Sequence, residues 1–231
     1  MNSNLKHQSN DPNCKGVEIL SIGTELLLGN IVNTNAQWIS EELSTLGLNH
    51  FRQSTIGDNS ERITKLIKEI SSRSNLLITT GGLGPTPDDL TTEAIAKSFN
   101  ATLSEREYLW DQIKKKLSIS GSTFNRSSLK KQCFFPKDAQ IINNPRGTAP
   151  GMIWKPIEGF TILTFPGVPS EMKEMWKETA LNYIKNNFSD GYIFFSNTLK
   201  FSGIGESTIS EKINNLLKLK NPTVAPYANL G

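Results

Sequence analysis

The sequence of 231 residues has little of the material that most catalytic side-chain arrangements need. It contains two cysteines, Cys14 and Cys133, and two histidines, His7 and His50. The cysteines lie far apart without paired spacing, so the sequence supports neither a disulfide framework nor a cysteine zinc site. A single histidine in the body of the chain leaves almost nothing for a Ser-His-Asp or Cys-His arrangement. Any chemistry must depend on carboxylates, amides, hydroxyls, lysines and the backbone.

Long apolar runs and strong charge are also missing. No apolar run approaches a membrane span, and the polar N-terminus lacks the apolar segment of a secretory signal, so residues 1–15 are predicted to be a disordered tail. The formal net charge is +3, and the local basic run from Lys114 to Lys116 falls on a helical pattern. The sequence therefore predicts a cytoplasmic protein with no membrane partner and no nucleic-acid partner.

Short apolar runs alternate with amphipathic helical patterns along most of the chain. This alternation indicates an α/β fold, a three-layer α/β/α domain with a mostly parallel sheet. The predicted strands are residues 16–23, 48–56 and 75–80. The predicted helices are residues 34–46, a helix through Ile63 and Ile70, and a helix through Ala94 and Phe99.

The sequence after residue 100 indicates further helices and strands of the same domain. We place this domain at residues 16–188. A capping box at residues 104–107 is expected to open a helix. Residues 151–155 and 160–165 are predicted to form a hairpin appended to the sheet. A helix through Tyr183 and Ile184 is expected to close the domain.

Residues 189–231 predict an incomplete α+β domain. The pattern indicates a strand at 192–201, a turn, and a helix through Ile209, Ile213 and Leu217. One strand, one helix and a partial strand cannot close a core of their own. This segment is therefore expected to depend on a partner and to promote self-association.

The loop after strand 75–80, within ITTGGLGPTPDDLTTEA (residues 78–94), has the composition of a phosphate-binding loop. It lies where a strand ends and a helix begins, so the free N–H groups of the helix favour an anion. Its candidate phosphate contacts are Gly81, Gly82, Gly84 and Thr86. Asp88 and Asp89 should repel a phosphate unless a divalent cation or sugar hydroxyls intervene. Alternatively, one of these acids caps the helix that starts near Leu90.

Other loops should reach the same edge of a parallel sheet. Each of their polar residues, taken alone, is typical of a turn, a cap or a surface acid. Their convergence makes them candidates for the site. They are Glu25 and Asn30, with Asn33 and Asn35 at the next helix start, then Asp58, and then Asn144, Gly147 and Thr148.

Several motifs, in matching order from residue 16 to the last residue, resemble the N-terminal part of the CinA family, the competence/damage-inducible protein. They are GTELLLGNIVNTNAQWISEELSTLG, TIGDN, TTGGLGPTPDDLTTEAIA, KQCFFP, NPRGTAPGM, FPGVPSEMKEMW, GIGES and NPTVAPYANLG. The resemblance implies the molybdopterin-binding fold shared with MoaB, MogA and gephyrin. It also implies a homodimer.

In the CinA family this region is associated with metal-dependent hydrolysis of ADP-ribose to AMP and ribose 5-phosphate, so the implied partner is a small nucleotide. We expect Asp89, Asp58 and Glu25 to bind a divalent metal or to orient water, because oxygen ligands suit magnesium, manganese or a similar ion. Asp88 is then the expected helix cap. Lys131, in the KQ segment, either offsets phosphate charge in catalysis or is an exposed structural lysine.

Two alternatives stay open at this point. One is an enzyme of molybdenum cofactor biosynthesis that adenylylates molybdopterin, which shares the fold and the glycine loop. The other is a non-catalytic nucleotide-binding module of a nicotinamide-nucleotide amidohydrolase. Nothing in this chain resembles the separate C-terminal domain that deamidates nicotinamide mononucleotide in the family, so deamidation by this chain is not expected.

Overall fold

The computed structural model describes residues 16–48, 50–120, 126–189 and 195–227. The predicted tail, with Cys14, lies outside the described residues. The chain divides into two units, Met1–Phe194 and Phe195–Gly231, and each is considered by itself. None of the helices in the described ranges has the length and hydropathy needed to cross a membrane.

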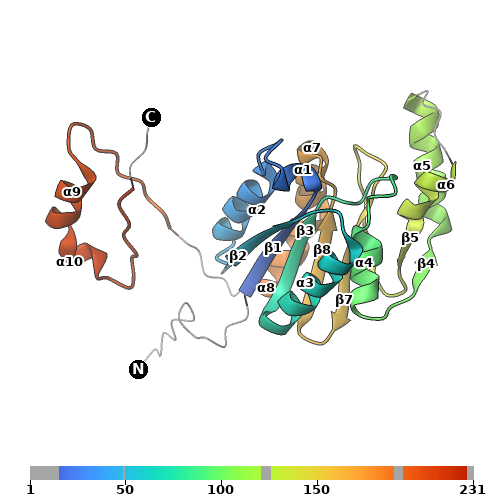
Figure 1. The fold of residues 1–231 in the computed structure, drawn as a ribbon, viewed down its shortest axis with the longest axis horizontal. Coiled ribbons are helices and arrows are strands. Elements are labelled where there is room, and N and C mark those ends of the chain that lie inside the picture. The colour runs from blue at the N-terminus through green and yellow to red at the C-terminus, as the bar shows by residue number, and fades with distance from the viewer. Residues whose placement is uncertain (1–15, 49, 121–125, 190–194, 228–231) are drawn as a thin grey trace. The chain divides into compact units, whose positions relative to one another are not determined.

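A six-stranded sheet forms the centre of the first unit, in the order β2-β1-β3-β8-β7-β6 (Figure 1). The four strands from β2 to β8 are parallel, and β7 and β6 are antiparallel to their neighbours. The mostly parallel sheet is therefore confirmed. The bounds are β1 (Gly16–Ile22), β2 (His50–Ile56), β3 (Ser74–Thr80), β6 (Gln140–Ile142), β7 (Gly151–Ile157) and β8 (Phe160–Phe165).

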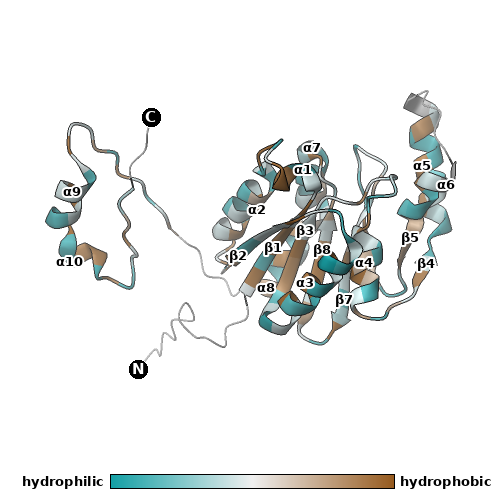
Figure 2. Cartoon of the chain, in the orientation of Figure 1, coloured by the Kyte–Doolittle hydropathy of each residue, from teal (hydrophilic) through white to brown (hydrophobic). Residues whose placement is uncertain are grey.

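Helices cover both faces of the sheet, which confirms the three layers. Successive side chains of a strand point to opposite faces, so on β1 Leu20 and Ile22 join one core and Val17 and Ile19 join the other. The central strands are accordingly apolar in Figure 2. The first core includes α3 (Ser60–Arg73), α4 (Thr91–Ser98) and α5 (Glu107–Ser120). The second includes α2 (Thr34–Thr45), α7 (Pro169–Met175), the π-helical turn η3 (Trp176–Ala180) and α8 (Leu181–Phe188).

A short two-stranded antiparallel sheet, β4 (Leu103–Glu105) with β5 (Phe134–Pro136), lies apart from the main sheet. We call residues 103–120 and 126–136 the arm; it also holds α5, α6 (Arg126–Lys130) and the 3₁₀ turn η2 (Lys131–Cys133). The predicted capping box is wrong, because Ser104 lies in β4 and its hydroxyl donates to the carbonyl of Phe135 at 3.3 Å. Pairing of β4 with β5 therefore replaces the local cap, and α5 begins at Glu107.

The predicted hairpin of β7 and β8 is present, and it is joined to the parallel strands through β8, which pairs with β3. Residues Ile157 and Phe160 pair, and Gly159 has a φ of 74° in the tight turn between them. All six residues of β8 are buried. A strand that is buried on both faces belongs in the interior of a sheet, and β8 accordingly lies between β3 and β7.

The regular elements described in the second unit are two short helices, and its other described residues are irregular. It contains α9 (Glu206–Lys212) and α10 (Asn214–Leu217), with a break at Ile213. The predicted strand is not present at residues 195–201, and its residues 192–194 lie outside the described ranges. A strand is stable only when it is hydrogen-bonded to a neighbouring strand, and residues 195–227 offer no strand with which residues 195–201 could pair. None of these residues is fully buried.

Candidate functional site

The carboxyl ends of the three inner parallel strands meet at Gly81. Its N–H donates to the carbonyl of Phe165 at 3.0 Å, and a Cβ at this position would lie 2.0 Å from the carbonyl oxygen of Ile22. The φ of Gly81 is +95°, which disfavours any side chain. Gly81 therefore lets β1, β3 and β8 end together, and it directs the following loop across the edge of the sheet.

A cavity of about 460 Å³ lies between this loop, the first turn of α4 and the arm. Its volume is within the range of small-molecule sites. Of the candidates from the sequence, it brings together Gly82, Gly84, Asp89 and Lys131. The other residues lining it are Leu83, Thr92, Glu93, Leu103, Lys130, Gln132, Phe134, Phe135 and Pro150.

The Asp89 carboxylate folds back into its own loop. Its Oδ2 accepts hydrogen bonds from the N–H of Thr86 at 2.9 Å and from the Thr86 hydroxyl at 2.6 Å. A Cβ on Gly84 would lie 2.4 Å from the same oxygen. Gly84 is therefore needed so that a carboxylate of the same loop can approach the backbone, and Thr86 holds that carboxylate.

Asp88 is not the helix cap that the sequence predicted. Helix α4 begins at Thr91, and its N-cap residue, Leu90, makes no side-chain capping bond. Thr91, the first residue of α4, fixes the start of the helix against the glycine loop. Its hydroxyl donates to the carbonyl of Gly81 at 2.8 Å, and its N–H donates to the carbonyl of Gly82 at 3.1 Å. Asp88 is exposed to solvent.

Two neighbouring residues of η2 hold the glycine loop from the side of the arm. Lys131 Nζ donates to the carbonyls of Thr86 and Asp89, both at 2.7 Å, and Gln132 Nε2 donates to that of Leu83 at 3.0 Å. We call this pair the clamp. Gln132 was not predicted from the sequence as a site residue, although it belongs to the KQ segment that drew attention to Lys131. The clamp makes Lys131 a residue that fixes the acidic loop.

The expected metal ligands are not brought together. Asp58 Oδ2 accepts from the N–H and the hydroxyl of Thr24, both at 2.8 Å, so it secures α1 (Thr24–Leu27). Glu25 is exposed and lies over Gly23, where a Cβ would be 2.5 Å from Oε1. Within the described ranges, no group of three or more His, Cys, Asp or Glu side chains could hold a metal ion. The ligand set Glu25, Asp58 and Asp89 therefore does not fit a single metal.

The amide candidates have structural partners outside the 460 Å³ cavity. Asn33 caps α2 by accepting from the N–H of Ala36 at 3.1 Å. Asn144 is buried and orders its own loop, because it donates to Glu171 Oε2 at 2.7 Å and accepts from the N–H of Gly147 at 2.8 Å. Thr148 lines a separate small cavity of about 10 Å³.

Lysine also secures this second loop. Lys116 of α5 donates to the carbonyls of Asn144 and Gly147, the latter at 2.8 Å. Burial lowers the pKa of Lys116, and the charge of Glu171 opposes this effect. Lys116 and Lys131 therefore connect two loops at the edge of the sheet to the arm.

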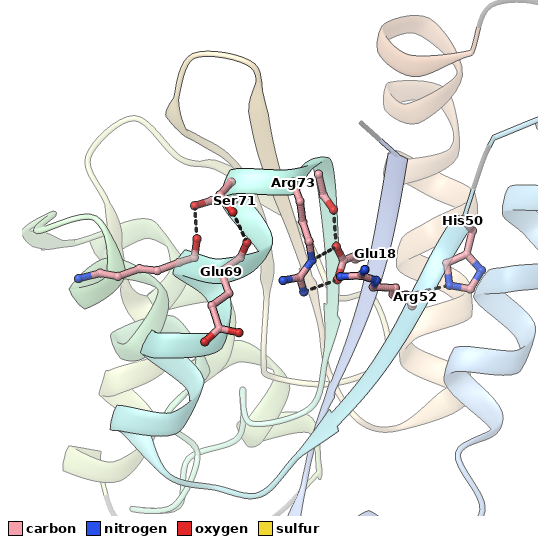
Figure 3. Close-up of polar contacts among 9 residues, drawn as sticks. Glu18, His50, Arg52, Glu69, Ser71 and Arg73 are labelled. Atoms are coloured by element: carbon pink, nitrogen blue, oxygen red, sulfur yellow. Dashed lines mark hydrogen bonds and ion pairs between the residues drawn. The ribbon is translucent and has the colours of Figure 1, made fainter. Parts of the chain in front are cut away.

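A buried carboxylate occupies the opposite end of the sheet (Figure 3). Glu18 of β1 pairs with Arg73 through two bonds of 2.8 and 2.9 Å, and it accepts from the Ser74 hydroxyl at 2.6 Å. Burial alone would raise the pKa of Glu18, but these bonds and the charges of Arg73 and Arg52 hold it below 4.5. Burial also lowers the pKa of nearby His50. This network joins α3 and β3 to β1 and is distant in the fold from the glycine loop.

Comparison with known proteins identifies the family. Residues 18–186 match the family model described as "Probable molybdopterin binding domain", and residues 196–231 match "Damage-inducible protein CinA KH domain". A crystal structure described as the protein CinA with unknown function, from Thermoplasma acidophilum, is 34% identical, with a TM-score of 0.67 over 75% of this chain and 99% of that chain. The chain belongs to the CinA family.

Curated relatives in the CinA family carry the name "CinA-like protein". The one from Prochlorococcus marinus subsp. pastoris (strain CCMP1986 / NIES-2087 / MED4) is 97% identical over 231 residues, which are 100% of this chain and 53% of that protein. The one from Synechococcus sp. (strain CC9311) is 56% identical over 216 residues, 94% of this chain and 51% of that protein. The chain therefore spans about half the length of the curated relatives it matches. The predicted membership of the CinA family and the molybdopterin-binding-like fold are confirmed.

Proposed function

We propose that the 460 Å³ cavity binds ADP-ribose and that the first domain hydrolyses its phosphoanhydride to AMP and ribose 5-phosphate. The observation that carries the proposal is the composition of the cavity lining, which combines glycine backbone, Asp89 and Lys131 with the apolar side chains Leu103, Phe134 and Phe135. A nucleotide needs both kinds of group, because its phosphates are anionic and its base is planar and largely apolar.

The chemistry requires water to attack one phosphorus atom while the bridging P–O bond breaks. The second phosphate leaves with the bridging oxygen, and the water gives up a proton. Two carboxylates line the cavity, Asp89 and Glu93, and we assign Asp89, which belongs to the glycine loop, to orient the water and take its proton. Its bonds to Thr86 both use Oδ2, so we assign Oδ1 to the water. The ammonium of Lys131 and the N–H groups of the glycine loop offset charge on the phosphates.

Dependence on a divalent ion stays a prediction. Since Glu25, Asp58 and Asp89 do not form one ligand set in the described residues, no step is assigned to a metal. Activity with added magnesium or manganese, compared with activity in EDTA, measures the dependence directly. Glu25→Gln should leave any metal response unchanged, because Glu25 does not line the cavity.

The test of the proposal is Asp89→Asn, with Asp88→Asn as the matched control. Asparagine can still accept from Thr86 but removes the charge and the basic oxygen, so Asp89→Asn should abolish hydrolysis while the melting temperature stays within a few degrees. Asp88→Asn removes the same charge from the neighbouring exposed position and should retain activity. Chromatography of AMP formed from ADP-ribose gives the rates. Parental rates in Asp89→Asn would contradict the proposed role.

A second candidate ligand is molybdopterin, which the description of the matching family model favours. A thermal-shift panel of ADP-ribose, AMP, ATP, nicotinamide mononucleotide and a pterin separates the two, because a ligand that binds the folded chain raises its apparent stability. Binding of ADP-ribose without turnover would instead favour a non-catalytic nucleotide-binding module.

A further inference from the structure

The side-chain amide of Gln132 is buried, and its nitrogen is hydrogen-bonded while its oxygen is not. Gln132 is 6% exposed, lines the 460 Å³ cavity, and donates from Nε2 to the carbonyl of Leu83. Its Oε1 has no hydrogen-bond partner among the described residues. Buried polar atoms in folded proteins are nearly always satisfied, so an unsatisfied carbonyl beside a cavity indicates a missing donor.

The orientation of this amide follows from its partner. The carbonyl of Leu83 can only accept, so the group that faces it must be the NH₂ of Gln132. Turning the amide over would place two acceptors together. Oε1 is therefore an acceptor by position, and a ligand that satisfies it must bring an N–H or O–H group.

The neighbouring residues select the kind of donor. Leu83 and Phe135 are buried, Phe134 is half-buried, and all three line the cavity with Gln132. A planar heterocycle packs against such surfaces with its polar edge toward an amide. Sugar hydroxyls are better accepted by the carboxylate of Glu93, which also lines the cavity.

We propose that Gln132 is a specificity-determining residue whose Oε1 accepts a hydrogen bond from the exocyclic amino group of a bound nucleotide base. The proposal rests on the nucleotide-binding function proposed above and adds the selection of the base. Because Oε1 is covered in the ligand-free chain, the amide turns toward the cavity as the base enters, while Nε2 keeps its contact with the glycine loop. In this arrangement each residue of the clamp contacts a different part of the ligand: Lys131 contacts the phosphates and Gln132 contacts the base.

The experiment compares AMP with purine riboside 5′-monophosphate, which differs from AMP in lacking the 6-amino group. Calorimetry on the full chain should show AMP binding roughly tenfold more tightly, the effect expected when a buried acceptor is left without its donor. In Gln132→Met, which keeps side-chain length but cannot accept, the two affinities should agree within about twofold. The ratio of the two affinities is insensitive to an equal loss of binding for both ligands, so a merely structural role of Gln132 would not change it.

Equal affinities in the parental chain would overturn the proposal, and this comparison does not depend on how the variant folds. A tenfold preference that survives in Gln132→Met would also overturn it, because another group would then read the amino group. If both ligands bind equally while ADP-ribose is still hydrolysed, the assignment of Gln132 is wrong and the proposed function stands. If neither ligand binds, the assignment of Gln132 fails, and if ADP-ribose is also not hydrolysed, the proposed function fails with it.

Discussion

Replacing Lys131 with methionine should release the glycine loop without unfolding the first domain. The change removes two hydrogen bonds of 2.7 Å that a charged amine donates to the carbonyls of Thr86 and Asp89. A buried bond of this type contributes about 1.5–3 kcal/mol. Because Thr86 is exposed, we take about 1 kcal/mol for each bond, as solvent screening requires. The free energy of opening the loop should therefore fall by about 2 kcal/mol, which is roughly a thirtyfold change in the opening equilibrium.

Hydrogen exchange of the amides in residues 81–90 measures this opening directly. Lys114→Met is the matched control, since it removes the same charge from an exposed pair with Asp111 on α5, outside the cavity lining. The Lys131 variant should exchange faster in this loop and bind AMP more weakly, while the control should match the parent in both.

Two outcomes would refute this interpretation of Lys131. If AMP affinity falls while exchange in residues 81–90 is unchanged, Lys131 acts on the ligand directly and the clamp does not position the loop. If exchange and affinity both stay at parental values, the two hydrogen bonds contribute nothing measurable.

The remaining predictions concern stability and reactivity. Glu18→Gln should lower the free energy of unfolding by about 2 kcal/mol at pH 7, since it leaves a partly buried arginine unpaired. The folded pKa of Glu18 lies below 4.5, so its contribution is present above 4.5 and is lost as the pH falls through the folded pKa; urea unfolding should show the two chains converging there. Gly82→Val should melt at a lower temperature and lose AMP binding, because Gly82 has a φ of +65° and a Cβ there would lie 2.2 Å from Thr91 Oγ1. Gly29→Val is the control for backbone strain alone, because Gly29 has a φ of +71° and a Cβ there would have no atom within 4 Å. Burial raises the pKa of Cys133 to about 11, so, in a variant without the N-terminal cysteine, Ellman's reagent at pH 8 should react only after unfolding.

The layered fold was predictable because its signals are local in the sequence. Residues 75–80 and 160–165 consist of apolar residues and threonines apart from Asn75, a composition that suits buried central strands. The α3 pattern places Ile63, Ile67 and Ile70 on one buried face. The position of β8 between β3 and β7 was not predictable, since strand order depends on contacts between distant segments. Ser104 shows the same limit: its local pattern favours a cap, and pairing with a strand about 30 residues away decides otherwise.

The candidate site was predictable where the backbone alone defines it. A glycine-rich turn after a buried strand indicates a loop at the carboxyl edge, and Gly82 and Gly84 do line the cavity. The carboxylates were harder to place, because a carboxylate bonds to the nearest donor: Asp58 bonds to Thr24, 34 residues away. For Gln132 the KQ segment indicated the region but not the role, because its burial and its bond to a residue 49 positions earlier arise only in the folded chain.

An acidic pair beside a loop proposed to bind phosphate presents an electrostatic conflict, and the hydrogen bonds of the loop reduce it. Asp88 is exposed, so salt and water screen its charge from a phosphate, and a hydrogen bond from Thr86 together with the charge of Lys131 lowers its pKa. Asp89 is held by two donors from Thr86, so part of its charge is already compensated. The ammonium of Lys131 lies against the carbonyl of Asp89 itself, which places a positive charge in the same part of the loop. An anion entering the cavity on the side of the glycine loop therefore meets the compensated carboxylate of Asp89 and the ammonium of Lys131; Glu93 and Lys130, one acid and one base, also line the cavity. If the cavity binds phosphate as proposed, replacing Lys131 with methionine should reduce the affinity for AMP more than the affinity for uncharged adenosine.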